Sequence, residues 1–313
     1  MTNVHICAFN ADEYSNHLEP NFPEVRFSVG ESQKELGAGL DDCEVLLAFG
    51  AMLNDGVFRE NKNLKWVQAM GTGVDGIIDQ SNIPSDILIT SMRGIHGPQM
   101  SELAFLLMLA LNRKFKKILD NQTVHNWERW PGLILEAKTV GIWGVGCVAE
   151  ALAKRCKAFE MIVVGITRTP RTLKNFDQIY AYTVVLEAVK ELDYLIVLAP
   201  YTPENEGMVN SEIFSRMKDS AFVIKLARGK VVDDEALISA LTNGDIAGAG
   251  LDVFAKEPLQ SSSPLWDFNN VIITPHIGGM SETYVRQAMP VIEHNLRAYL
   301  ENDYGRMMNR VTR

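Results

Sequence analysis

Cysteine, long apolar runs and positive charge are all scarce in this sequence, and each shortage excludes a class of protein. The four cysteines (Cys7, Cys43, Cys147 and Cys156) show neither CxxC spacing nor a dense framework, so we expect reduced thiols, no metal site and a cytoplasmic location. The net charge of −9 argues against nucleic acid and membranes as partners. The most apolar run, residues 103–111, has about half the length of a membrane-spanning helix. The first residues carry no basic stretch, so we expect no signal peptide.

Apolar segments recur along the chain in the rhythm of an α/β protein. Its 313 residues favour two domains. Apolar runs at 4–9, 44–49, 65–70 and 87–90 alternate with amphipathic stretches, which predicts a parallel sheet with crossover helices. A second series lies at 139–143, 161–166, 194–200, 221–226, 247–254 and 271–275, and strands this continuously apolar are covered on both faces. We therefore predict two Rossmann-like, doubly wound parallel-sheet domains with a cleft between them.

Two helical patterns set the predicted domain boundaries. Apolar residues recur at helical spacing from Gln99 to Asp120, and the first half of this segment is apolar all round, so the helix needs burial on two sides. We expect a homodimer to supply part of that burial. The helical pattern after Ser281 is expected to return to the first domain. The first predicted domain is residues 1–98 plus 286–313, flavodoxin-like, and the second is residues 99–285.

A glycine-rich loop follows the predicted strand at 139–143. Residues 144–149 read GVGCVA, a GxGxxA pattern that opens a predicted helix. Gly144 allows a tight turn, Gly146 lets a pyrophosphate approach the backbone, and Ala149 keeps the helix close to the strand. The pattern alone is weak, but its place between strand and helix favours dinucleotide binding over a structural glycine turn. We therefore predict that residues 99–285 form a dinucleotide-binding domain and residues 1–98 plus 286–313 a substrate domain.

The carboxylate that usually binds the adenosine ribose is missing from its expected place. The end of the next predicted strand reads GITRTPR at 165–171, and no acidic residue follows until Asp177. Thr167, Arg168 and Arg171 suit a 2′-phosphate, because guanidinium groups pair with phosphate oxygens and no carboxylate repels them. We therefore expect NADP(H) to be preferred and NAD(H) to be the second choice. The alternative is that the two arginines form a solvated basic turn.

Three further candidates follow predicted strands in the last third of the chain: Arg228 in LARGKVVDDEAL, Glu257 in GLDVFAKEPL and His276 in ITPHIGG. Loops after parallel strands meet at one edge of a sheet. With the GxGxxA loop and the segment GTGVD at 71–75, these motifs resemble the D-isomer-specific 2-hydroxyacid dehydrogenase family over nearly the whole chain. The resemblance is strongest to its glyoxylate/hydroxypyruvate reductase branch, where a basic replacement of the ribose-binding acid goes with NADP(H).

The resemblance implies an oxidoreductase that transfers a hydride from NAD(P)H to a small 2-oxo acid and releases the D-2-hydroxy acid. Arg228 would bind the substrate and polarise its carbonyl, because a guanidinium is permanently charged. His276 would contact the substrate and donate the proton, and Glu257 would raise the pKa of that histidine. Singly, these residues suit a surface ion pair, a solvated turn and a strand-end histidine, whereas three such motifs together favour catalysis.

The resemblance also assigns binding residues, which are the backbone of Cys147 and Val148 for the pyrophosphate, Pro200 for the adenosine side, Leu226 and Ala227 beside the nicotinamide ring, and Asp252 for the nicotinamide amide. Thr72 and Gly73 correspond to a loop whose N–H groups hold the substrate carboxylate, although a plain glycine turn explains them equally well. One departure is that the family often has a small or polar residue plus asparagine before the ARG motif. This chain has Ile224-Lys225-Leu226 there, so the nicotinamide pocket is expected to differ slightly.

Two other interpretations stay open. One is an NAD-linked dehydrogenase of another 2-hydroxy acid, such as phosphoglycerate or a branched-chain acid. The other is a dinucleotide-sensing binding protein like the corepressor relatives of this family. The roles of His96, Trp127 and Trp130, the identity of the 2-oxo acid, the physiological direction and the oligomer size also stay open.

Overall fold

The computed structural model describes residues 1–30, 42–54 and 56–312, and the chain divides into two compact units. Unit 1 is Met1–Ile95 with Ser281–Arg313, and unit 2 is His96–Met280. The boundaries expected from the sequence, 98/99 and 285/286, lie a few residues further along the chain at both crossings.

Unit 1 is built on a five-stranded sheet with the strand order β2-β1-β3-β4-β5. Every neighbouring pair is parallel, and this is the strand order of flavodoxin-like folds. The strands are β1 (Thr2–Cys7), β2 (Val25–Gly30), β3 (Val45–Ala48), β4 (Trp66–Ala69) and β5 (Leu88–Thr90). The helices described here include α1 (Ala11–Leu18), α3 (Val57–Glu60) and α10 (Tyr284–Leu300).

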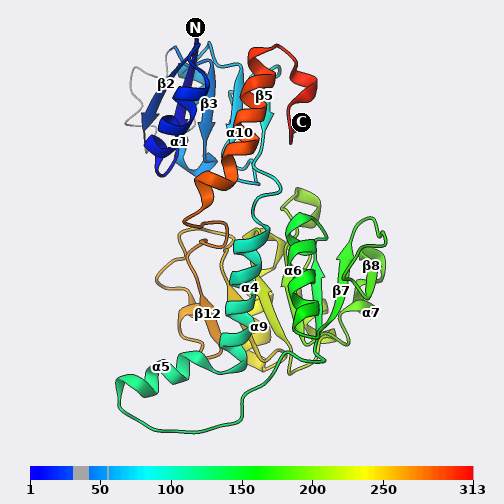
Figure 1. Cartoon of the computed structure of the whole chain (residues 1–313). Coiled ribbons are helices and arrows are strands. Elements are labelled where there is room, and N and C mark those ends of the chain that lie inside the picture. Colours follow the sequence, from blue (N-terminus) through cyan, green and yellow to red (C-terminus); the bar gives the residue numbers. More distant parts are fainter. Residues whose placement is uncertain (31–41, 55, 313) are drawn as a thin grey trace. The chain divides into compact units, whose positions relative to one another are not determined.

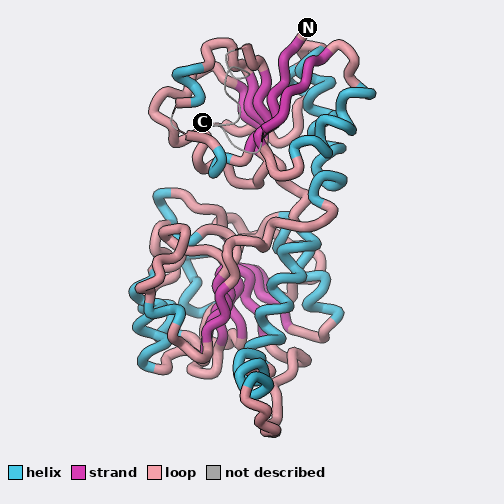
Figure 2. Tube along the Cα trace, turned by 90° about the vertical axis from the view of Figure 1, so that its left-hand side faces the viewer, coloured by secondary structure: helices cyan, strands magenta, loops and turns pink. Residues whose placement is uncertain are grey.

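Helices cover both faces of this sheet, as Figure 2 shows for the magenta strands of the unit. On one face, Tyr14 of α1 and Ile292 of α10 share a core with Val4 of β1. On the other face, Phe58 of α3 shares a core with Val67 of β4. Burial of both faces explains why β3 and β4 are buried at every position and β1 at its last four.

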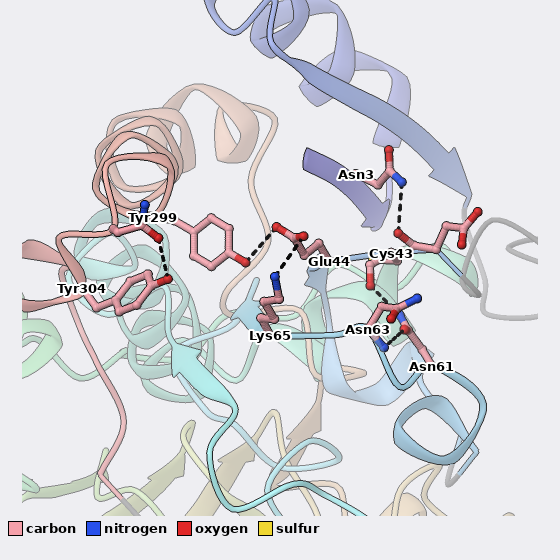
Figure 3. Close-up of polar contacts among 10 residues, drawn as sticks. Asn3, Cys43, Glu44, Asn61, Asn63, Lys65, Tyr299 and Tyr304 are labelled. Atoms are coloured by element: carbon pink, nitrogen blue, oxygen red, sulfur yellow. Dashed lines mark hydrogen bonds and ion pairs between the residues drawn. The ribbon is translucent and has the colours of Figure 1, made fainter. Parts of the chain in front are cut away.

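The end of α10 is attached to the sheet of unit 1 through Glu44, the residue before β3 (Figure 3). Its carboxylate accepts hydrogen bonds from the Tyr299 hydroxyl at 3.1 Å and from the Lys65 ammonium at 3.2 Å. Tyr299 also stacks on Trp66 of β4, with 5.3 Å between the ring centroids. These contacts explain how a helix from the end of the sequence belongs to the first unit.

Unit 2 is built on a seven-stranded sheet with the order β12-β11-β10-β9-β6-β7-β8, again with every pair parallel. Its strands are β6 (Thr139–Trp143), β7 (Ile162–Thr167), β8 (Gln178–Ala181), β9 (Tyr194–Val197), β10 (Phe222–Lys225), β11 (Gly248–Leu251) and β12 (Val271–Ile273). Its helices are α4 (Gly97–Asn112), α5 (Phe115–Thr123), α6 (Cys147–Ala158), α7 (Val185–Ala188), α8 (Ser211–Arg216) and α9 (Asp234–Asn243). The predicted α/β class with two parallel sheets is confirmed.

Helices also cover both faces of the second sheet. α4 and α6 lie side by side on one face (Figure 1), where Leu107 and Leu152 share a core with Ile142 of β6. The residues that α8 and α9 bury, such as Phe214 and Leu237, belong to the core on the other face. The sheet is therefore doubly wound, and its central strands are apolar on both sides.

The single helix expected from 99 to 120 is instead two helices. α4 ends at Asn112, Lys114 adopts a left-handed conformation with φ 52°, and α5 begins at Phe115. The apolar spacing continues through this break, but Phe115 and Ile118 lie on an exposed face rather than in a core. The spacing therefore gave no sign of the break. α5 and the segment after it project away from the rest of unit 2 (Figure 1). No helix within the described ranges, α4 included, is long and apolar enough to cross a membrane.

Two strands that the sequence pattern did not reveal, β2 and β8, lie at sheet edges. Both have mixed burial rather than the continuous burial of β3 or β9. Their partial burial leaves these two sequences without the apolar run by which the other strands, including the edge strands β5 and β12, were found.

Candidate active site

The candidate residues of unit 2 gather at one edge of its sheet. Because the strands are parallel, their carboxyl ends lie along the same edge, and the strand order reverses at β6, with β7 and β8 on one side and β9 to β12 on the other. Ligands of open α/β sheets bind at such a reversal. The loops after β6, β7, β9, β10, β11 and β12 carry, in that order, the glycine loop, Arg168, Pro200, Arg228, Glu257 and His276.

The two glycines of the loop between β6 and α6 occupy their positions for different physical reasons. Gly144 has φ 101°, and a Cβ there would lie 2.4 Å from the backbone nitrogen of Ala199. Gly146 is the residue before α6 and has extended backbone, and a Cβ there would meet no described protein atom within 4 Å. Gly144 is therefore required by the fold, whereas Gly146 keeps open space at the start of a helix. That space, beside the backbone of exposed Cys147, fits a pyrophosphate.

The basic segment after β7 is exposed, and the first acidic residue that follows it in the sequence, Asp177, is engaged elsewhere. The side chains of Arg168 and Arg171 are both exposed, and Arg171 lies 3.5 Å from the Glu150 carboxylate of α6. Asp177 accepts a hydrogen bond of 2.7 Å from the N–H of Val163, near the start of β7, and pairs with a lysine. Asp177 therefore lies at the opposite end of the strand from Arg168 and does not occupy the place of a ribose-binding acid.

Arg228 is held in place by the glycine that follows it. It precedes a short 3-10 helix, η6 (Gly229–Val231), and its guanidinium donates a 2.8 Å hydrogen bond to the carbonyl of Ala227. A Cβ at Gly229 would lie 1.9 Å from the carbonyl carbon of Phe254. Only glycine allows the Arg228 loop to pack this closely against the loop that carries Glu257.

Glu257 and His276 form a direct pair across two neighbouring loops. The imidazole Nδ1 donates to Oε2 of Glu257 at 2.6 Å, and Oε1 of the same carboxylate accepts from the N–H of Phe254 at 2.8 Å. The carboxylate is thus fixed at both oxygens. The ring nitrogen Nε2 lies on the side of the imidazole away from Glu257, on a side chain that is 45% exposed.

The electrostatics of the pair favour its ionised form. The hydrogen bond with Glu257 raises the pKa of His276 above its ordinary value, and this outweighs burial and the charge of Arg228, which both lower it. Burial raises the pKa of Glu257, but the hydrogen bonds from His276 and Phe254 and the nearby positive charges outweigh burial and leave that pKa below its ordinary value. The pair therefore favours an imidazolium against a carboxylate, and Arg228 is close enough to affect the pKa of both groups.

Asp252 anchors the loop that carries His276. This fully buried carboxylate accepts hydrogen bonds from the hydroxyl of Thr274 at 2.5 Å and from the N–H groups of Ile277 at 3.0 Å and Gly278 at 2.9 Å. His276 has φ 55°, which is uncommon for a residue with a side chain, and its N–H donates to the Asp252 carbonyl at 2.8 Å. These bonds hold the backbone of His276 in an otherwise unfavourable conformation and so fix the position of its imidazole.

The sequence did not single out Gly229, Thr274 or Gly278 for this framework. For Gly229 the usable signal was a glycine directly after Arg228 in a catalytic motif. A partly buried threonine such as Thr274 has no pattern that separates it from other strand-end residues. Of the remaining expected cofactor residues, Thr167 ends β7, Val148 lies in the first turn of α6, and Leu226 and Ala227 follow β10. Within the described residues, no cluster of three or more His, Cys, Asp or Glu is arranged to hold a metal ion.

The expected substrate-binding residues lie in the other unit, and the three residues whose roles the sequence left open lie elsewhere in unit 2. Thr72 and Gly73 are in unit 1, in the turn after β4. His96 is buried at the start of α4, where its Cδ2 would lie 3.3 Å from a Cβ built on Gly279. Trp127 is 82% exposed in the segment after α5. Trp130 donates a hydrogen bond of 3.3 Å to the carbonyl of Arg113 in the same region.

Comparison with known proteins identifies the family. Residues 105–278, all within unit 2, match the family model of the D-isomer specific 2-hydroxyacid dehydrogenase NAD binding domain. The chain belongs to this family. The resemblance stated from the sequence is confirmed, and so is the enzyme class, an NAD(P)-dependent 2-hydroxyacid dehydrogenase.

Two curated relatives are similar over most of this chain. A glyoxylate reductase of Pyrococcus furiosus is 35% identical over 301 residues, which cover 91% of this chain and 88% of that protein. A D-3-phosphoglycerate dehydrogenase of Archaeoglobus fulgidus is 34% identical over 272 residues, which cover 85% of this chain but only 51% of that protein. This chain therefore spans about half the length of the second relative.

A solved structure gives the same result for the fold. The D-isomer specific 2-hydroxyacid dehydrogenase of Xanthobacter autotrophicus Py2, in complex with NADPH and MES, has a TM-score of 0.86 and 27% sequence identity. The match covers 99% of this chain and 98% of that chain. A member of this family is thus built on the same two parallel sheets.

Proposed function

We propose that this dehydrogenase reduces a short 2-oxo acid of the glyoxylate or hydroxypyruvate type to the D-2-hydroxy acid, with NADPH as the preferred cofactor. The observation that carries the proposal is the 2.6 Å Glu257–His276 pair on the sheet edge that also carries Arg228 and the glycine loop. Similarity to a glyoxylate reductase supports the substrate class. We place the reaction in the cytoplasm, where the four free cysteines would stay reduced.

In this proposal each of the three residues has one task. Arg228 binds the substrate carboxylate and polarises the 2-oxo carbonyl, since its charge is permanent. His276, protonated at Nε2, gives its proton to the carbonyl oxygen as negative charge develops there. Glu257 holds Nδ1, which orients the ring and keeps it protonated before the reaction. In the reverse direction the neutral imidazole takes the proton back.

The cofactor proposal rests on the sites for the pyrophosphate and for the nicotinamide of the dinucleotide. The open space at Gly146 and the backbone of Cys147 and Val148 suit the pyrophosphate, and the bound nicotinamide supplies the hydride. Leu226, Ala227, Asp252 and Pro200 follow strands on the same edge and are proposed to line the remainder of the cofactor site.

A preference for NADP(H) is supported by the segment after β7. Arg168 is exposed at the carboxyl end of β7, with Thr167 before it, and Asp177 is engaged at the other end of the strand. We assign the 2′-phosphate to Arg168 first and to Arg171 second, because Arg171 already faces the Glu150 carboxylate.

For the substrate carboxylate we also propose the N–H groups of Thr72 and Gly73 in unit 1. They lie in the turn that follows β4, and the carbonyl of Gly71 in the same turn accepts from the N–H of Met92 at 2.9 Å. This bond fixes one end of the turn, and a fixed turn presents its N–H groups in a constant geometry.

A second candidate substrate class is a phosphorylated 2-hydroxy acid used with NAD(H). The specific observation in its favour is the 34% identity to a D-3-phosphoglycerate dehydrogenase. It needs no change in the roles of Arg228 and His276, so it differs only in the acid and the cofactor.

We further propose that the chain forms a homodimer through an apolar face of unit 2. This face is defined by Leu106, Phe115, Leu119, Val124 and Trp127, all of which are exposed. Leu106 lies on α4 and the other four lie on or after α5, and exposed apolar side chains of this kind are typical of a subunit contact. Sedimentation of the wild type should give a dimeric mass and Trp127→Glu a monomeric one, and a monomeric wild type would contradict the proposal.

Steady-state rates with NADPH and with NADH, each against glyoxylate, hydroxypyruvate, pyruvate, 3-phosphohydroxypyruvate and a branched 2-oxo acid, test the substrate and cofactor together. The proposal predicts the highest kcat/KM for NADPH with glyoxylate or hydroxypyruvate. Faster turnover of the phosphorylated acid with NADH would establish the second candidate. Binding of either cofactor without turnover of any acid would refute both.

A further inference from the structure

A buried lysine lies directly behind the proposed catalytic loops. Lys225 is the last residue of β10, and only 1% of its side chain is exposed. A buried ammonium needs a partner, because an unpaired charge inside a protein is costly. Here the partner is Asp234, the first residue of α9, whose Oδ1 lies 2.5 Å from the lysine Nζ.

Asp234 also contacts the loop that carries Glu257. The cap of α9 is supplied by the preceding residue, Asp233, which accepts from the N–H groups of Glu235 and Ala236. Asp234 is therefore not needed to begin the helix. Its Oδ2 instead accepts from the N–H of Ala255 at 3.3 Å, in the loop that leads to Glu257.

The loop joins this contact to Glu257 within a few residues. The N–H of Phe254 donates to Oε1 of Glu257 at 2.8 Å, and Oε2 faces His276. Gly229 packs against the same backbone, at Phe254 and Ala255, from the side of Arg228. Movement of Ala255 would therefore displace Glu257 from His276.

Stability alone does not account for such a pair. Buried ion pairs add little or no net stability over apolar residues of the same volume, because both charges lose water. A lysine and an aspartate fixed behind a catalytic loop are better explained by the position they impose on it. Glu257 lies close enough to Lys225 for their charges to interact, so the pair also contributes to the field at the site.

We propose that Lys225 and Asp234 are positioning residues that hold the Glu257 loop, and through it His276, in the reactive arrangement. This inference rests on the proposed function, in which His276 is the proton donor. The groups that face His276 and set its protonation are Glu257, Arg228 and Asp252. Of these, Glu257 is the one whose loop the ion pair holds.

Both charges are removed together in the test, since either alone would leave a buried or partly buried charge unpaired. The double variant Lys225→Met/Asp234→Ala loses the ion pair and the acceptor for Ala255. The double variant Lys225→Met/Asp234→Asn loses the charges but keeps an amide oxygen that can accept from Ala255. Glu235→Ala, which removes an exposed carboxylate one residue further along, is the matched control.

For the first double variant we expect kcat for 2-oxo acid reduction to fall about ten- to hundredfold, as for a small misplacement of a catalytic group. As pH rises, the activity of this variant should begin to decline at a lower pH than that of the wild type. Its KM for NADPH should stay unchanged. The asparagine variant should recover most of kcat, and Glu235→Ala should match the wild type. Wild-type kcat and pH profile in the first double variant, even with a changed Tm, would overturn the proposal.

A His276→Ala variant in the same assay separates this inference from the proposed function. Activity comparable to the wild type in His276→Ala would refute the proton-donor role itself. A strong loss in His276→Ala, with no loss in Lys225→Met/Asp234→Ala, would refute only the positioning role.

Discussion

The two glycines of the phosphate loop give the sharpest contrast between fold and function. Gly144→Ala places a Cβ 2.4 Å from the backbone nitrogen of Ala199 at a φ of 101°. The backbone strain costs about 1–3 kcal/mol and the overpacking about 1–3 kcal/mol. For a domain of this size that corresponds to a fall in Tm of roughly 5–20 °C.

Gly146→Ala should have the opposite profile. Its Cβ meets no described atom within 4 Å and its φ of −127° suits alanine, so Tm should stay within about 2 °C of the wild type. The methyl group would occupy the space proposed for the pyrophosphate, and each charge-assisted hydrogen bond lost there is worth about 1.5–3 kcal/mol, or about tenfold or more in Kd.

Differential scanning fluorimetry and NADPH titration of the two variants, with the wild type beside them, measure both quantities. The reasoning predicts a lower Tm for Gly144→Ala alone, and a raised Kd at a wild-type Tm for Gly146→Ala. Wild-type NADPH affinity in Gly146→Ala would refute the assignment of this loop to the pyrophosphate.

The remaining predictions concern the charges of the site. In Glu257→Gln the carboxylate that contributes most to raising the pKa of His276 is lost, and only the charge of Asp252 still raises that pKa against burial and Arg228, which lower it. The decline of reductive kcat/KM with rising pH should therefore begin at lower pH, and an unmoved profile would mean that Glu257 does not set the protonation of the ring. The same raised pKa means that His276 stabilises the folded state fully below pH 6.5, and that this contribution is lost as pH rises through the folded-state pKa. Arg168→Ala should raise KM for NADPH about tenfold, the lower end of the range for a charged hydrogen bond because the side chain is exposed, and should leave KM for NADH unchanged. Arg171→Ala should have a smaller effect because that guanidinium already faces Glu150, and equal loss with both cofactors would exclude a 2′-phosphate contact.

The sequence predicted those parts of the fold that depend on burial of both faces of a sheet. The inner strands, such as β6 and β9, appear as continuous apolar runs, and the GxGxxA loop falls between β6 and α6 as expected. The edge strands β2 and β8 were missed because partial burial leaves no such run. The break at Lys114 was missed because apolar spacing does not distinguish a core from an exposed apolar face.

The candidate site, too, could be predicted from the sequence only in part. Arg228, Glu257 and His276 belong to motifs that the sequence displays, whereas their mutual geometry depends on contacts between distant loops. Lys225 shows the limit most clearly, since a lysine at the end of a strand is usually exposed and only the packed structure places it beside Asp234. Continuous apolar runs along the chain report which strands are covered on both faces, but not which polar side chains meet inside the protein.

The central claim is that His276 donates the proton in the reduction of a 2-oxo acid. The most direct test is single-turnover oxidation of NADPH by glyoxylate in the wild type and in His276→Ala, with NADPH affinity measured on the same samples. The claim predicts a rate about 10²–10⁴-fold lower in the variant with unchanged NADPH Kd, the usual contribution of a general acid. A rate within a few-fold of the wild type, with the cofactor bound equally well, would contradict it.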